Sequence, residues 1–99
     1  MTVYVDDMKQ KTIINNLSAE WSHLFTIPVC EQELDNFAIL IGLKIKWKQK
    51  SGSLDVHYDV TEKKRQLAIQ KGAIPITALE GARLRLIYKR RYAALGNQP

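Results

Sequence analysis

The order of strand-type and helix-type segments is the feature that most limits how this chain can fold. Short stretches of β-branched and aromatic residues indicate strands, and apolar residues spaced three and four positions apart indicate helices. Strands that alternate with helices favour βαβ units and a largely parallel sheet. Because the chain has only 99 residues, we expect a single α/β domain with a small, mostly parallel sheet of three to four strands and about three helices.

The expected elements follow from a pass along the chain. They are a strand at 2–5, an irregular stretch at 9–18, a strand or extended segment at 21–29, a helix at 31–43, a strand at 44–50, a turn at 51–53, a helix from 59 or 61 to 71, a strand at 73–77 and a helix at 78–95. The helix at 31–43 has the clearest apolar stripe, formed by Leu34, Phe37, Ala38 and Ile41. The segment 44–50 alternates lysine with other residues, which predicts a strand with one solvated face.

The C-terminal part of the chain differs in charge from the rest. After Glu80 there are no acidic residues, but there are five basic ones, which equal the whole net charge of +5. Thr77 and Glu80 have the spacing of a capping box at a helix start. We therefore divide the chain into an α/β domain at 1–77, a basic helix at 78–95 that packs on the domain or serves association, and a frayed tail at 96–99. The basic helix favours an anionic partner, and a solvated face is the alternative.

The composition excludes several classes of protein. Cys30 is the only cysteine, so the chain forms no intramolecular disulfide and no thiolate zinc site, and a reducing compartment is indicated. The N-terminus lacks the profile of a signal peptide, and no apolar run approaches the ~20 residues that span a bilayer. We expect a cytoplasmic protein with no membrane partner.

Polar side chains follow the expected strands. Asp6 and Asp7 come after the first strand, and His57 and Asp59 come after the strand at 44–50. Ligands of an open parallel sheet bind beyond the carboxyl ends of its strands, so a parallel sheet would bring these groups to one rim. If the strands pair antiparallel, this reasoning fails.

These groups suggest metal and acid–base chemistry. Asp6 and Asp59 are candidate ligands for Mg²⁺ or Mn²⁺, and His57 and His23 are candidate catalytic acids or bases. Each assignment has a structural alternative. Asp59 is also a candidate helix cap, one residue of the pair Asp6 and Asp7 is a candidate turn-maker, and His23 is a candidate structural histidine.

Other residues suggest how a ligand would be bound. Lys64 and Arg65 lie on the helix that follows His57, where they could clamp a phosphate near the helix start. Trp47 and Tyr58, together with Trp21, could stack on a base or another ring. For the tryptophans, packing in the core is the alternative.

Several blocks of sequence resemble a known family. The sequence contains no HExxH, CxxC, GxSxG or Walker motif. The blocks are Val3-Tyr4-Val5-Asp6-Asp7-Met8, Trp21-Ser22-His23-Leu24, Ala38 to Ile41-Gly42-Leu43, Trp47, His57-Tyr58-Asp59-Val60, Lys64-Arg65, Ala68-Ile69 and Gly72-Ala73. Together they resemble the domain of unknown function 4031 family, small proteins of bacteria and their phages. The resemblance covers about residues 1–77, leaves the last helix outside, and implies no activity.

Three hypotheses about function follow. The first is a polar rim site for a phosphorylated ligand, a nucleotide or nucleic acid, with metal-dependent phosphoryl hydrolysis as its enzymatic form. The second is a binder without catalysis, which sequesters a nucleotide signal or binds nucleic acid. The third is an interaction module whose last helix pairs with a second copy or inhibits a host protein.

Overall fold

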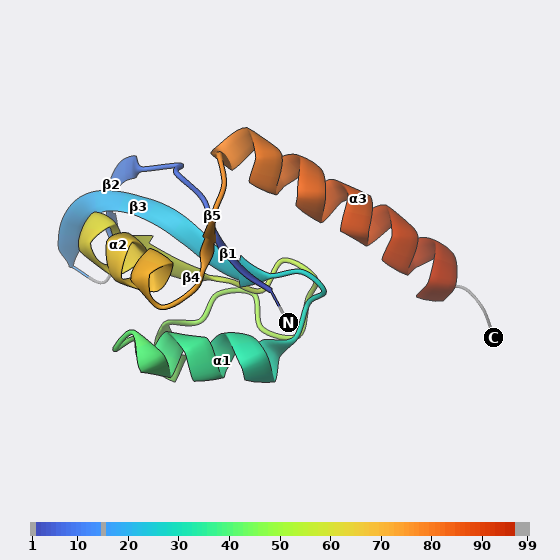
Figure 1. The fold of residues 1–99 in the computed structure, drawn as a ribbon, viewed down its shortest axis with the longest axis horizontal. Helices are drawn as coiled ribbons and strands as arrows, with labels where there is room; N and C mark the ends of the chain where they lie inside the picture. Colours follow the sequence, from blue (N-terminus) through green and yellow to red (C-terminus); the bar gives the residue numbers. More distant parts are fainter. Residues whose placement is uncertain (1, 15, 97–99) are drawn as a thin grey trace.

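A curved sheet with two helices against it forms the main body of the molecule, and a third helix projects from that body (Figure 1). The computed structural model describes residues 2–14 and 16–96. The elements, in chain order, are β1 (Val3–Val5), β2 (Gln10–Ile14), β3 (Leu17–Thr26), α1 (Glu31–Leu40), the 3₁₀ helix η1 (Ile45–Trp47), β4 (Tyr58–Thr61), α2 (Glu62–Gln70), β5 (Ile74–Pro75) and α3 (Ala78–Gly96). We call residues 2–77 the body. The prediction of an α/β fold with three helices is confirmed.

The sheet is mixed, so the prediction of a mostly parallel sheet is wrong. It has five strands, and the long strand β3 pairs antiparallel with β1, β2 and β4. The pair β1–β5 is parallel. The reason lies in the connections: β2 and β3 are joined by a hairpin-length link, which reverses the chain, whereas parallel neighbours require a long crossover. The stretch 9–18, expected to be irregular, forms β2 and the start of β3.

The lysine-rich segment 44–50 does not form the expected strand. It forms η1 and then a single bridge between Gln49 and His57. Its alternating lysines do not mark a solvated strand face, because Lys48 folds back onto α1 and its Nζ lies 2.9 Å from Asp35 Oδ2. The next strand along the chain is β4, and it includes Asp59, which was one of the two expected starts of the following helix. Thr61, the other expected start, caps α2 through its hydroxyl, which accepts the Lys64 N–H.

The core lies between the sheet and the helices α1 and α2. The stripe expected on α1 is buried, and α1 ends before Gly42, whose φ of +85° is the left-handed conformation expected there. Tyr58 is fully buried among the core residues, and its hydroxyl donates a 2.6 Å hydrogen bond to Asp35. Burial and this bond raise the pKa of Tyr58 above its usual range. One hydrogen bond thus satisfies the polar end of a core side chain.

A capping box fixes the start of α3, and the C-terminal part of the helix projects from the body (Figure 1). The capping box is confirmed: Thr77 N–H donates to Glu80, and Glu80 N–H donates to the Thr77 hydroxyl, each at 3.0 Å. Gly81 lies so close to Phe25 that an added Cβ would be 3.5 Å from its ring. Beyond Lys89, which pairs with Asp55 at 2.6 Å, the helix extends away from the sheet (Figure 1).

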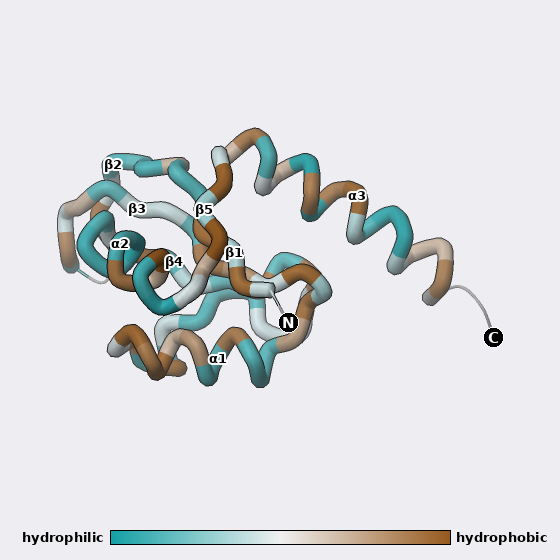
Figure 2. The backbone as a smooth tube through the Cα atoms, in the orientation of Figure 1, coloured by the Kyte–Doolittle hydropathy of each residue, from teal (hydrophilic) through white to brown (hydrophobic). Residues whose placement is uncertain are grey.

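Of the tail expected at 96–99, Gly96 ends α3 and 97–99 lie outside the described residues. Apolar and polar residues alternate around the projecting helix (Figure 2). Within the described residues, no helix is both long and apolar enough to cross a membrane.

Candidate functional site

Two histidines and one aspartate meet on the face of the β3–β4 pair. Strand side chains alternate between faces, so His57 and Asp59, two residues apart, point to the same side. The antiparallel register places His23 of β3 directly opposite Asp59 of β4. One ligand atom from each of the three residues lies within 4.8 Å of the other two, and the two imidazole rings are 5.2 Å apart in an edge-on arrangement. We call these residues the His–His–Asp cluster.

Asp6 orients His23, one histidine of this cluster, through the ring nitrogen Nδ1. Its buried carboxylate lies 2.8 Å from His23 Nδ1 and also accepts the backbone N–H groups of His23 and Met8. Burial disfavours the charge on Asp6, but these hydrogen bonds outweigh burial and lower its pKa. A charged carboxylate accepts hydrogen bonds only, so His23 carries its proton on Nδ1. Its Nε2 therefore presents a lone pair when the ring is neutral.

The second histidine is oriented by a backbone group. His57 Nδ1 lies 2.7 Å from the carbonyl oxygen of Asp55, which can only accept, so Nδ1 again carries the proton. Burial disfavours the imidazolium, but the hydrogen bonds to Asp59 and to the Asp55 carbonyl prevail and raise the pKa of His57. His57 directs Nε2 toward Asp59, and an oxygen acceptor behind each Nδ1–H, as both histidines have, is the arrangement that orients metal-binding histidines.

The distances in the cluster suit a small cation. His57 Nε2 lies 3.5 Å from Asp59 Oδ1. Two ligands at ~2.0–2.1 Å from a tetrahedral metal are roughly 3.4 Å apart, so this pair is already near the required spacing. The widest separation among the three ligand atoms is within 4.8 Å. All three residues are partly exposed, so the cluster is accessible from solvent.

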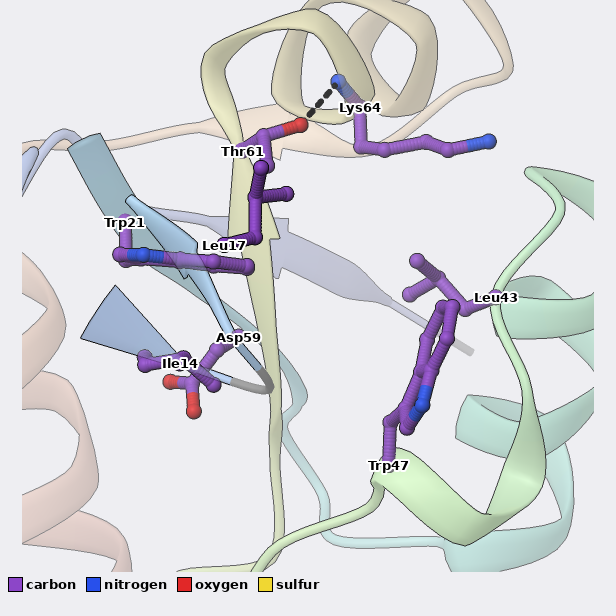
Figure 3. Close-up of a pocket in the computed structure, with 8 residues that line it drawn as sticks. All are labelled: Ile14, Leu17, Trp21, Leu43, Trp47, Asp59, Thr61 and Lys64. Carbon is purple, nitrogen blue, oxygen red and sulfur yellow. Dashed lines mark hydrogen bonds between the residues drawn. The ribbon is translucent and has the colours of Figure 1, made fainter. Parts of the chain in front are cut away.

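A pocket of about 220 Å³ adjoins the cluster, and Asp59 belongs to both (Figure 3). Its apolar lining comes from the β2–β3 hairpin and from the segment after α1: Ile14, Leu17, Trp21, Leu43 and Trp47. Its polar lining is Asp59, Thr61 and Lys64. In Figure 3, Trp21 and Trp47 lie on opposite sides of β4, with the stem of Lys64 extending above. The indole N–H of Trp21 donates to the Thr12 carbonyl at 3.1 Å, which fixes that ring.

The structure brings together only part of the predicted site. Asp6, His23, His57 and Asp59 are adjacent, although the parallel rim that was to unite the site does not exist; the antiparallel register of β3 and β4 does so instead. Asp6 stands behind His23 and outside the group of three possible metal ligands. Asp59 is a strand residue and not a helix cap.

The remaining predicted residues serve the fold in different ways. Asp7 accepts the Ala78 N–H at 2.7 Å, so it holds the start of α3. Arg65 donates from Nε to the Asp6 carbonyl at 2.7 Å, and Lys64 donates from Nζ to the Ile41 carbonyl at 2.7 Å. Tyr58 is buried in the core, whereas Trp47 and Lys64 line the pocket.

Sequence reasoning missed three contributors to the site. The Asp55 carbonyl orients His57, Thr61 lines the pocket, and the charge of Arg85 on α3 partly opposes the rise in the pKa of His57. The alternation His57–Tyr58–Asp59–Val60 was the available signal for a strand with its two polar residues on one face. A backbone carbonyl leaves no signal in a sequence.

Comparison with known proteins adds a family and no activity. No curated protein and no solved structure matches the chain. A family model does match, and the match continues past residue 77 into α3, farther than the blocks of resemblance indicated. The chain belongs to the family described as Protein of unknown function (DUF4031), whose model matches residues 3–88.

Proposed function

We propose that the His–His–Asp cluster binds a divalent transition metal and that this centre hydrolyses a phosphate ester. One observation carries the proposal: three ligand atoms converge within 4.8 Å, and both histidines have an oxygen acceptor behind Nδ1. Three protein ligands leave coordination positions open, as catalytic metal sites require. In this assignment His23 and His57 hold the metal and do not transfer protons themselves.

The donor set favours some metals over others. Two imidazole nitrogens and one carboxylate suit Zn²⁺, Mn²⁺ or Fe²⁺, whereas Mg²⁺ prefers oxygen ligands alone. Of the two cations expected from the sequence, Mn²⁺ therefore fits better. A metal held here would polarise a phosphoryl oxygen and lower the pKa of water.

Arg85 supports the choice of a phosphorylated substrate. Its guanidinium lies over the ring of Phe25, 4.8 Å from the centroid, and Phe25 is two residues beyond His23 on the same face of β3. A guanidinium beside a metal is suited to binding phosphoryl oxygens. In hydrolysis, a bond forms between water oxygen and phosphorus, the bond to the ester oxygen breaks, and that oxygen takes up a proton.

The test is metal binding followed by turnover. Isothermal titration with Zn²⁺ and Mn²⁺ should give one site per chain, and His57→Ala or Asp59→Asn should weaken binding at least tenfold. Glu20→Gln removes an exposed carboxylate on β3 and serves as the matched control, with unchanged affinity. With metal bound, p-nitrophenyl phosphate and bis-p-nitrophenyl phosphate report hydrolysis.

The two halves of the proposal fail separately. An absence of metal binding in the wild-type protein overturns the metal site. Metal binding that His57→Ala does not weaken also overturns it. Metal binding without hydrolysis of phosphate esters, nucleotides or nucleic acid overturns the enzymatic half and leaves a metal-dependent binder.

Exposed apolar side chains on α3 favour a second function, association with another copy of the chain. Five large apolar residues of this helix are about half exposed or more: Leu79, Leu86, Ile87, Tyr92 and Leu95. We propose that Leu79, Leu86 and Ile87, which lie within about 100° of one another around the helix, form a homodimer contact. Light scattering should show a dimer that the double substitution Leu86→Lys and Ile87→Lys converts to a monomer. Ile13→Lys, which adds the same charge on β2, should remain dimeric; a monomeric wild-type protein contradicts the proposal.

A further inference from the structure

Three features lie in a row along one face of β3. Trp21, His23 and Phe25 are separated by two residues each, so their side chains share a face and follow one another at about 7 Å. Trp21 lines the pocket, His23 belongs to the cluster, and Phe25 lies under the guanidinium of Arg85. The row therefore runs from an aromatic pocket through a candidate metal site to a cation.

The pocket is suited to a planar ring. At about 220 Å³ it is smaller than the roughly 300–1,000 Å³ of pockets that hold drug-sized ligands, so it fits one ring system. Both tryptophans of the chain line it. Indole faces provide stacking surfaces that accept any flat heterocycle.

The polar edge of the pocket favours a ring that carries hydrogen-bond acceptors. The Thr61 hydroxyl accepts the Lys64 backbone N–H, so its own proton remains available to a ligand. Lys64 Nζ donates one of its three protons to the Ile41 carbonyl, so two protons remain for a ligand. Two donors thus lie on the pocket wall, and a hydrocarbon ring would leave both unpaired.

From this row of sites we infer that the substrate is a nucleoside phosphate. The base occupies the pocket that Trp21 and Trp47 line, and the phosphate reaches the His–His–Asp cluster and Arg85. Asp59 is shared by pocket and cluster, so a ring in the pocket presents its substituent to the cluster. This inference rests on the proposed function for its phosphate half only.

Intrinsic fluorescence tests the inference, because both emitting indoles line the pocket. Adenosine 5′-monophosphate should quench the emission in the presence of Mn²⁺, and ribose 5-phosphate, which lacks the base, should not. Adenosine alone, titrated without metal, tests the pocket independently of the cluster. A short oligonucleotide tests whether the base belongs to a free nucleotide or to a nucleic-acid end: tighter binding of the oligonucleotide assigns the site to the polymer.

Substitutions separate the pocket from the metal site. Trp47→Ala should weaken adenosine and nucleotide binding at least fivefold, read from Trp21, while the affinity for Mn²⁺ stays unchanged. Trp47→Phe keeps a stacking face and should restore most of the binding, which also controls for folding. Tyr92→Ala removes an exposed aromatic residue on α3 and should have no effect.

The outcomes are distinct. If adenosine leaves the fluorescence unchanged, or if Trp47→Ala binds as tightly as the wild-type protein, the inference is overturned even where metal binds. If adenosine binds but Mn²⁺ does not, the pocket stands and the metal-dependent function fails. Equal binding of ribose 5-phosphate and the nucleotide also overturns a site for the base.

Discussion

The helix α3 is richer in apolar residues than the body, but it buries fewer of them. In the body, residues such as Leu24, Leu34 and Val60 are shielded between sheet and helices. Along α3, large apolar side chains remain about half exposed, and the helix contacts the body from its start as far as Lys89. The body thus owes its stability to packing, whereas α3 relies on its cap, a few polar contacts and whatever it binds.

The difference teaches where each function can reside. A metal site requires side chains held to within fractions of an ångström, as in the packed β3–β4 pair. An association surface requires exposed apolar area, which α3 carries along its length. Substitutions in the two regions should therefore differ in their effects.

Removing a core side chain should cost far more than removing a similar one from α3. Leu34→Ala creates a cavity under the sheet and should lower the free energy of unfolding by ~2–5 kcal/mol. Leu86→Ala should stay within ~0.5 kcal/mol when the chain is diluted to the monomer, because about half of that side chain is exposed in the single chain. Urea denaturation measures both. Losses of similar size at the two positions would show that α3 is part of the core.

The neighbouring residues Asp6 and Asp7 contact different regions: Asp6 binds His23 in the sheet, and Asp7 binds the start of α3. Asp6→Asn places an amide N–H₂ where His23 Nδ1–H needs an acceptor, which reverses the tautomer and should weaken metal binding by roughly 10–100-fold. Asp7→Asn keeps an oxygen for the Ala78 N–H and should change the metal affinity by less than about twofold. Metal titration compares the pair; equal effects would refute a special role for Asp6.

Acid should loosen the start of α3 by a small amount. The Thr77 backbone N–H and hydroxyl bind the Glu80 carboxylate and lower its pKa, so the fold favours the charged form. A lowered pKa means that this stabilisation is present above the unfolded value of ~4.3 and is lost as the pH falls through the folded value. Amide exchange at residues 78–81 should therefore increase, relative to intrinsic rates, between pH 6 and pH 3.

A matched variant isolates this carboxylate. Glu80→Gln retains an oxygen acceptor for the Thr77 N–H but does not titrate, so its exchange should lack the pH-dependent change. If the variant and the wild-type protein respond alike to acid, the capping box is not the cause.

Local chemistry allowed some of the fold to be predicted. The stripe of α1, the left-handed Gly42 and the Thr77–Glu80 capping box are set by residues within one or two turns of each other, and all three predictions are confirmed. The sheet was harder because strand direction depends on how distant segments pair. The lysine alternation at 44–50 imitated a strand, and the polar stretch that becomes β2 gave no periodic signal.

The candidate site shows the same limit. The residue types were recognisable, since His23 and His57 are the two histidines of the chain and Asp59 lies two residues after His57. Their meeting depends on the β3–β4 register, which pairs residues 36 positions apart, His23 with Asp59. Neither that register nor the Asp55 carbonyl behind His57 can be derived from local spacing.

The strand β3 contributes side chains to both the core and the site, so both depend on the same strand register. Its Leu24 faces inward, while Trp21 and His23 on either side serve the pocket and the cluster. A shift of one residue in its pairing would turn every side chain to the opposite face. A point substitution on this strand changes one side chain, whereas an insertion or deletion of one residue would disrupt the core and the site together. Relatives that keep the site should vary in the length of their loops but not in the length of this strand.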